Sequence, residues 1–184
     1  SDAGCEVVTG ICEDECRWLN RRFFTFHEKR RPYIILKWAR SRDGFIDTDR
    51  PAGSESGPFW ITGKSERVLV HKWRSEEQAI LAGGATIRKD NPALTVRDWT
   101  GNNPIRLVLT RSGNLGNYPY KTETKSPLIA FTSNTEADLG DAEKVILSER
   151  YSSSQQIAEY LYEKGVQSLF IEGGAELITH FAGT

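Results

Sequence analysis

The chain has 184 residues, enough for one domain with its own hydrophobic core and a short appendage. Its 24 Lys and Arg residues nearly balance its 25 Asp and Glu residues, so bulk charge gives no reason to expect nucleic acid or a membrane surface as a partner. No apolar run approaches the ~20 residues that a membrane span needs, and no stretch reads as a signal peptide. We therefore expect a cytoplasmic protein.

Residues 1–31 differ in composition from the rest of the chain. Residues 13–20 begin with acidic side chains and suit a short helix, since negative charge is favourable at a helix N-terminus. Residues 21–31 are aromatic and basic without a clear period, and we interpret their basic cluster as a solvated face. We expect a linker or appendage here, with the domain boundary at Pro32.

All three cysteines lie in this first part, at Cys5, Cys12 and Cys16. An odd number close to one end does not indicate a disulfide framework. As zinc ligands they lack a fourth partner, because no pair has the CxxC spacing and His27 stands at an unsuitable distance along the chain. We therefore expect no metal site. The other two histidines, His71 and His180, are isolated and are expected to make ordinary packing contacts.

The first strand is expected over residues 33–41, an almost entirely apolar run typical of a central strand covered on both faces. Lys37 interrupts this run. A charged side chain in such a strand must reach water, a carboxylate or a ligand, because burying an unpaired charge costs too much free energy. Lys37 is thus a candidate for substrate contact, and an ammonium that reaches solvent past the strand edge is the alternative.

The stretch around Gly83 and Gly84 has the form of a ligand-binding turn. A short apolar strand over residues 78–82 precedes it, and the glycine pair lets the backbone turn sharply and approach a ligand closely. Residues 86–89 can form one helical turn, which ends before Pro92 because the residue preceding proline avoids the helical region. Backbone N–H groups in such a turn point at a bound anion. For this stretch taken alone, a tight strand-to-loop connection without a ligand is the alternative.

Strands and helices alternate along the rest of the chain. Helices are expected over residues 62–74, with Thr62 as the N-cap, and over residues 152–164, with Gly165 as the stop. The remaining strands are expected over residues 105–110, 128–132, 145–147 and 168–171, before a last helix over residues 175–182. This alternation predicts an α/β fold with a largely parallel central sheet flanked by helices.

In such sheets, ligands bind beyond the carboxyl ends of the strands. Candidate ligand contacts and both glycine pairs lie at or near such ends, at Lys37 to Ser41, Gly83-Gly84, Thr110-Arg111 and Glu172-Gly173-Gly174. Two strand-Gly-Gly-helix units in one chain predict a site that holds a nucleotide between two backbone cradles. The GxGxxG fingerprint of a Rossmann fold is absent.

Six motifs occur in the order and at the spacing of a known family: Arg31-Pro-Tyr-Ile-Ile-Leu-Lys37-Trp-Ala39-Arg-Ser41-Arg-Asp43-Gly44, Trp60-Ile-Thr-Gly, His71-Lys-Trp-Arg74, Ala79-Ile-Leu-Ala-Gly-Gly-Ala-Thr86, Asp90-Asn-Pro-Ala-Leu94-Thr-Val-Arg97 and Phe170-Ile-Glu172-Gly-Gly174. With them, the chain from residue 31 resembles the reductase domain of the bifunctional riboflavin-biosynthesis deaminase/reductase. Residues 5–30 resemble the tail of the deaminase domain that precedes it. The deaminase signature, His-x-Glu with Pro-Cys-x-x-Cys, is absent, so neither zinc nor deamination is expected.

The resemblance implies a dihydrofolate-reductase-like fold and NADPH as the cofactor. It implies reduction of the ribosyl group of 5-amino-6-(5-phosphoribosylamino)uracil to the ribitylamino product by hydride transfer. Residues 1–31 would then be the deaminase tail or linker, and residues 32–184 the reductase domain, which stops before the strands with which relatives continue. A homodimer is expected for the full-length protein.

Carried over position by position, the resemblance assigns cofactor contacts to Ala39, Trp60, Gly83, Gly84, Thr86, Asp90, Arg111, Gly173, Gly174 and Ala175. Arg111 stands where a serine often meets the nucleotide, and it is a candidate for binding the 2′-phosphate. Substrate contacts fall on Arg74, Leu94 and Arg97. Pro58 occupies a place where a serine commonly contacts substrate, so Ser56 is the expected substitute.

The chemistry agrees with this division. Arg74 and Arg97 suit a substrate phosphate, because guanidinium binds phosphate bidentately, and Leu94 would pack on the pyrimidine or the sugar. Lys37 and Glu172 are the expected catalytic residues, which orient the sugar and supply or relay the proton that accompanies hydride. For Glu172, capping of the helix after Gly174 is the alternative.

Other functions stay open at this point. One is a reductase of the undeaminated diaminopyrimidine, or of another substrate of dihydrofolate-reductase-like enzymes. A second, of a different class, is a nucleotide-binding module that is inactive as a fragment. Nucleic-acid binding through residues 17–31 is disfavoured by the neutral overall charge.

Overall fold

The computed structural model describes residues 3–47, 60–116 and 126–183. Its strands are β1 (Tyr33–Lys37), β2 (Ala79–Gly83), β3 (Ile105–Leu109), β4 (Leu128–Thr132), β5 (Glu143–Ile146) and β6 (Ser168–Glu172). They form one sheet in the order β1-β6-β2-β3-β4-β5, and every neighbouring pair is parallel. The predicted largely parallel central sheet is therefore confirmed.

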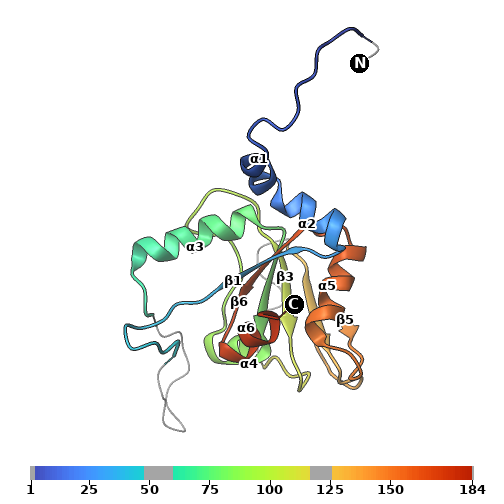
Figure 1. The fold of residues 1–184 in the computed structure, drawn as a ribbon. Coiled ribbons are helices and arrows are strands. Elements are labelled where there is room, and N and C mark those ends of the chain that lie inside the picture. The colour runs from blue at the N-terminus through green and yellow to red at the C-terminus, as the bar shows by residue number, and fades with distance from the viewer. Residues whose placement is uncertain (1–2, 48–59, 117–125, 184) are drawn as a thin grey trace.

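Helices lie on both sides of this sheet (Figure 1). They are α1 (Glu13–Leu19), α2 (Arg21–Lys29), α3 (Lys64–Glu76), α4 (Gly84–Asp90), α5 (Ser153–Glu163) and α6 (Ala175–Phe181). Because parallel strands need crossover connections, a helix leads from β2 to β3 and another from β5 to β6. The α/β fold expected from the sequence is confirmed.

Two apolar clusters fill the space between the sheet and its helices. Neighbouring residues of β2 point to opposite faces, so that Leu81 packs in the cluster of Ile157 from α5 and Ile80 packs in the cluster of Ile87 from α4. α6 belongs to the first side, and α3 adds Val70 to the second. Burial on both faces explains why these strands read as continuous apolar runs.

The first helices lie across one end of the domain (Figure 1). α1 confirms the helix expected over residues 13–20. α2 was not expected, because residues 21–31 show no clear period. Long-range contacts hold α2: Arg22 Nε donates to Glu77 Oε2 at 2.8 Å, and the Phe26 ring lies 4.7 Å from the Tyr162 ring of α5. The domain boundary at Pro32 stays a prediction.

Two expectations about the strand and helix limits are wrong. The strand predicted over residues 33–41 ends at Lys37, and among the described strands it lies at a sheet edge, paired only with β6. A turn draws the chain away, since the Ser41 N–H donates to the Phe45 carbonyl at 2.7 Å. α3 has Gly63 rather than Thr62 as its N-cap. The stop at Gly165 is confirmed, since its φ is 73°.

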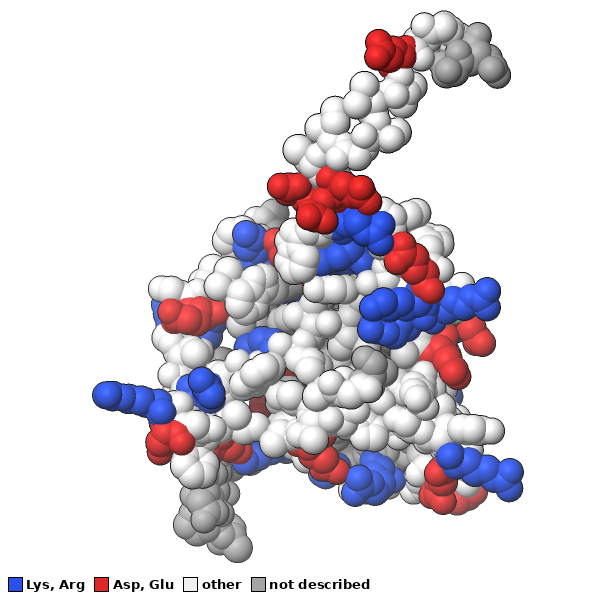
Figure 2. All heavy atoms as spheres, viewed as in Figure 1, with Lys and Arg blue, Asp and Glu red and all other residues white. Residues whose placement is uncertain are grey.

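Charges of both signs are interspersed on the surface in view (Figure 2). Members of the basic cluster in the first helices have intramolecular partners: Arg17 pairs with Glu28 at 3.3 Å, and the Arg21 guanidinium lies 4.3 Å from the Trp18 ring. Within the described ranges, no helix is both long enough and apolar enough to cross a membrane.

Candidate active site

The carboxyl ends of β2, β3 and β6 border one cavity of about 700 Å³. Gly83 and Gly84 line it at the end of β2, Thr110 and Arg111 line it after β3, and Gly174 lines it after β6. α4 and α6, which follow the two glycine pairs, lie at this same end of the sheet (Figure 1). The two glycine turns therefore converge on one cavity, in the place where α/β sheets bind ligands.

Each glycine pair has one member that packs and one that faces open space. A Cβ on Gly84 would lie 2.8 Å from the Thr110 Cβ, whereas a Cβ on Gly83 or Gly174 would meet no atom within 4 Å. Gly83 and Gly174 have φ values of −79° and −66°, which any residue can adopt. Room for close approach of a ligand, rather than a left-handed turn, is therefore what glycine provides at these two positions. In the second pair, Gly173 is the packing member, since its Cβ would lie 2.7 Å from the Leu177 Cδ2.

Thr110 lines this cavity and carries a buried hydroxyl. The residue is 2% exposed, and its Oγ1 forms no hydrogen bond with any residue that the structure describes. A buried hydroxyl without a partner costs about 1–3 kcal/mol. A polar ligand group would supply that partner. Together with the open sides of Gly83 and Gly174, the hydroxyl fits a dinucleotide cofactor.

An ion pair crosses the rim of the cavity. Arg111, two residues after β3, donates to Glu176 Oε1 of α6 at 2.9 Å. Both side chains are largely exposed, at 88% and 81%, so the pair contributes little to stability. The Arg111 guanidinium is therefore available to exchange this carboxylate for an anionic ligand group.

The other residues expected to contact the cofactor divide into two groups. One group lines the cavity or flanks Gly174 in the chain: Thr86, Gly173 and Ala175. The second group is not among the described residues that line this cavity: Ala39, Trp60 and Asp90. Ala39 lies two residues beyond β1, and Asp90 ends α4.

Arg74 and Glu172 form a bidentate ion pair between α3 and the end of β6. Arg74 Nε and Nη2 donate to the two carboxylate oxygens, each at 2.7 Å, and Nη1 donates to the Thr95 carbonyl at 3.0 Å. The two side chains are only 10% and 14% exposed. All three guanidinium nitrogens of Arg74 thus have protein partners, and Arg74 orients Glu172.

Lys37 lies beside Glu172. The two residues are register partners at the carboxyl ends of β1 and β6, so their side chains project from the same face of the sheet. Lys37 lines a second groove, of about 490 Å³, together with Trp38 and Phe170. Within the part of the chain that the structure describes, its ammonium forms no ion pair. The two expected catalytic side chains are thus neighbours, and Arg74 holds one of them.

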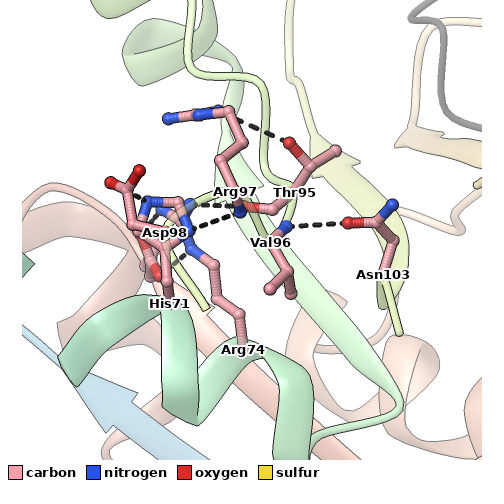
Figure 3. Close-up of polar contacts among 8 residues, drawn as sticks. His71, Arg74, Thr95, Val96, Arg97, Asp98 and Asn103 are labelled. Carbon is pink, nitrogen blue, oxygen red and sulfur yellow. Dashed lines mark hydrogen bonds and ion pairs between the residues drawn. The ribbon is translucent and has the colours of Figure 1, made fainter. Parts of the chain in front are cut away.

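A segment after α4 presents the second predicted substrate arginine (Figure 3). The Val96 N–H donates to Asn103 Oδ1 at 2.7 Å, and the Arg97 N–H donates to His71 Nδ1 at 3.1 Å. The Arg97 side chain is exposed and makes one long contact, 3.4 Å, with the Thr95 hydroxyl. Arg97, unlike Arg74, therefore offers its guanidinium to a ligand.

The remaining substrate candidates fall elsewhere. The Leu94 side chain is 1% exposed and packs in the core with Ile80 and Ile87, while its backbone has a φ of 54°. The sequence predicts that the Leu94 side chain packs on the substrate. Because this side chain is buried in the core, a contact from Leu94 to a ligand would come from its backbone. Ser56 lies outside the described residues.

Two buried polar residues near the site, His71 and Thr110, had no ligand or positioning role predicted from the sequence. His71 is 5% exposed, and burial lowers its pKa below the usual 6.5, with the Arg74 and Arg97 charges acting in the same direction. Its i, i+3 relation to Arg74 places both on one side of α3, which the sequence could have indicated. Thr110 follows β3 directly, so the rule that pointed to the glycine pairs applied to it as well.

Comparison with known proteins gives consistent similarities. Residues 32–183 match the family model of the RibD C-terminal domain. Riboflavin biosynthesis protein RibD of Aquifex aeolicus is 39% identical over 173 residues, covering 94% of this chain and 42% of that protein. The 2,5-diamino-6-ribosylamino-4(3H)-pyrimidinone 5′-phosphate reductase of the same organism is 30% identical over 160 residues, covering 82% of this chain and 70% of that protein.

A solved structure gives the same result. The crystal structure of a diaminohydroxyphosphoribosylaminopyrimidine deaminase/5-amino-6-(5-phosphoribosylamino)uracil reductase from Thermotoga maritima has a TM-score of 0.83 at 35% identity. The alignment covers 99% of this chain and 50% of that one. The present chain thus spans about half or less of the length of these bifunctional proteins.

Proposed function

The chain belongs to the RibD C-terminal domain family and has a dihydrofolate-reductase-like fold, and on this premise we propose that it is an NADPH-dependent reductase of riboflavin biosynthesis. The proposed reaction converts the ribosyl group of 5-amino-6-(5-phosphoribosylamino)uracil to the ribitylamino product. The observation that carries the proposal is the convergence of two glycine turns on one cavity, with Glu172 directly before the second turn.

On the cofactor side, the proposal assigns backbone contacts to Gly83 and Gly174, whose Cβ positions face open space. The Thr110 hydroxyl would gain a hydrogen-bond partner, and Arg111 would meet the 2′-phosphate. When bound, NADPH supplies the hydride. The choice of NADPH over NADH belongs to the proposal and depends on Arg111.

On the substrate side, reduction of ribosyl to ribityl adds one hydride to the anomeric carbon and one proton to the ring oxygen as their bond breaks. We assign the proton to the Lys37 ammonium, next to Glu172 in the sheet. The Glu172 carboxylate, held by Arg74, would accept hydrogen bonds from the sugar hydroxyls. Arg97, with its exposed guanidinium, would bind the substrate phosphate.

One relative supports a second candidate substrate. The Aquifex pyrimidinone phosphate reductase, of which this chain covers 70%, carries the undeaminated diaminopyrimidine in its name. A reductase of that compound is therefore the alternative within the same reaction class. The alternative of another class, a nucleotide-binding module without catalysis, would share the cavity and lack turnover.

For the whole protein, the proposal includes a cytoplasmic location, a homodimer, no nucleic-acid partner, and a deaminase tail in residues 1–31. A nicotinamide cofactor is general to this family of reductases, and the name of the Aquifex reductase gives a ribosylaminopyrimidine phosphate as the substrate class. The cofactor class supports the proposal of NADPH, and the substrate class supports the proposal of the ribosylaminopyrimidine as substrate.

The test uses the fluorescence of NADPH. Mixing the chain with NADPH should give saturable binding, and adding the deaminated ribosylaminopyrimidine should consume the NADPH. Faster turnover of the undeaminated compound would favour the alternative substrate, and binding without turnover of either compound would leave a binding module. Lys37→Met should lower kcat by about 100-fold or more. Lys29→Met, on the exposed side of α2, serves as the matched control and should match the wild-type rate.

A further inference from the structure

His71 is a buried histidine that contacts the backbone of Arg97 and has no role in the proposed reaction. It lies in α3, one turn before Arg74, and it is 5% exposed. Its Nδ1 accepts the backbone N–H of Arg97 at 3.1 Å, and its Nε2 lies 3.5 Å from Asp98 Oδ2 (Figure 3). A buried imidazole thus joins α3 to the residue proposed to bind the substrate phosphate.

The backbone of residues 95–97 is anchored at three successive positions. Arg74 donates to the Thr95 carbonyl at 3.0 Å, Asn103 accepts from the Val96 N–H at 2.7 Å, and His71 accepts from the Arg97 N–H. Among the described residues, the Arg97 side chain makes one polar contact, at 3.4 Å to the Thr95 hydroxyl. The position of its guanidinium therefore depends mainly on the anchored backbone, and His71 is the anchor at Arg97 itself.

This contact requires a particular protonation state. Nδ1 can accept a hydrogen bond only when it carries no proton, so the proton of the neutral ring lies on Nε2 and points toward Asp98. A second proton on Nδ1 would set two donors against each other. The charged groups around the ring are Arg74 on α3, Arg97 and Asp98 on the loop after α4, and Glu172 on β6. Burial and the two arginines outweigh the carboxylates and lower the His71 pKa.

We propose that neutral His71 is a positioning residue that holds Arg97 in place for the substrate phosphate, and that protonation of His71 at acid pH releases Arg97. The inference rests on the proposed function for the identity of the ligand. It does not depend on that function for the contact between His71 and Arg97. No step of the reductive chemistry passes through His71.

Three substitutions separate the hydrogen bond from the rest of the side chain. In His71→Asn, the amide oxygen can stand near the position of Nδ1, so the acceptor is kept and the titration is removed. In His71→Gln, the amide reaches the Nε2 position instead, and His71→Leu keeps only the volume. We expect the KM for the ribosylaminopyrimidine to rise about tenfold in the Gln and Leu variants and to stay near wild type in the Asn variant. The kcat and the KM for NADPH should change less than about twofold in all three.

The pH profile supplies a second readout. The substrate phosphate itself titrates near about pH 6, so kcat/KM of the wild type falls at acid pH for two reasons. In the His71→Asn variant the substrate phosphate still titrates, but there is no imidazole at position 71 to titrate. The ratio of wild-type to Asn-variant kcat/KM should therefore be flat at pH 8 and fall by up to about tenfold per pH unit below the His71 pKa. A ratio that stays flat down to pH 5 would overturn the proposal.

Amide hydrogen exchange at Arg97 distinguishes failure of this inference from failure of the proposed function. Its exchange should be faster in the Leu and Gln variants than in the wild type and the Asn variant, with or without substrate. If the wild type turns over no pyrimidine but the expected exchange rates are observed, the proposed function is wrong, whereas the positioning of Arg97 by His71 is supported. Equal exchange in all four proteins, or an unchanged substrate KM in an active His71→Leu variant, overturns the inference. His27→Leu, at an exposed position of α2, is the control substitution of a histidine.

Discussion

Arg74 and Glu172 are 98 residues apart in the chain and form a bidentate ion pair with two contacts of 2.7 Å. The pair is nearly buried, and it ties α3 to the carboxyl end of β6 just before the Gly173-Gly174 turn. Through its third nitrogen, Arg74 also holds Thr95. One side chain thus links the proposed catalytic carboxylate to the segment that carries Arg97.

Glu172→Gln should lower both activity and stability. The Arg74 guanidinium would lose a charged partner in a nearly buried place, which costs about 3 kcal/mol in the free energy of unfolding, and kcat should fall about 100-fold. Urea unfolding and steady-state rates measure the two effects. Glu176→Gln is the matched control for stability, because the Arg111–Glu176 pair is largely exposed and should contribute little to the free energy of unfolding. Equal unfolding midpoints for the two variants would contradict the expected role of burial.

The two kinds of glycine should separate cofactor binding from stability. Gly174→Ala places a methyl group in open space with an allowed backbone, so stability should stay near wild type while NADPH affinity falls about tenfold. Gly84→Ala forces a Cβ to within 2.8 Å of the Thr110 Cβ and should destabilise the fold by about 1–3 kcal/mol. Fluorescence titration measures the NADPH affinity of the two variants, and thermal unfolding measures their stability. Unchanged NADPH affinity in a folded Gly174→Ala variant would remove this turn from the proposed site.

Arg111 should decide between the two nicotinamide cofactors. Arg111→Ser removes the exposed guanidinium at the rim of the cavity, so the Kd for NADPH should rise about tenfold while the Kd for NADH stays the same. Glu176→Gln should act in the opposite direction, because it releases Arg111 from its carboxylate partner. An equal loss of affinity for both dinucleotides would assign Arg111 to a group that the two cofactors share.

The stability of the protein should depend on pH through His71. Its pKa is lowered in the folded state, whereas in the unfolded chain it is about 6.5. Above that pH both states are neutral at His71 and stability is unaffected. As pH falls from about 6.5 toward the folded pKa, only the unfolded chain takes up the proton, so the free energy of unfolding decreases by at most about 1.4 kcal/mol per pH unit. Urea midpoints at pH 7.5 and 5.5 should differ more for the wild type than for His71→Asn, and parallel decreases would contradict the assignment.

Much of the fold could be predicted because strands and turns leave local marks. The apolar runs that became β2, β3, β4 and β6 were recognisable without any partner strand. α2 could not be predicted in this way, because its contacts come from Glu77 and Tyr162, which are 55 and 136 positions away from Arg22 and Phe26. β1 was expected in the centre of the sheet, since an apolar run alone does not tell how many neighbours a strand has.

The features of the candidate site also fall into two groups, those visible in short stretches of sequence and those that depend on the fold. The apolar runs of most strands and the two glycine pairs could be recognised in the sequence, because apolar runs and a missing Cβ are properties of short stretches of chain. The folded structure was needed to show which glycine packs and which faces the cavity, and that Arg74 pairs with Glu172 while Arg97 stays exposed. It was also needed to show that His71 accepts the Arg97 N–H. Each of these depends on distances between segments that the fold brings together, and such distances leave no mark on either segment alone.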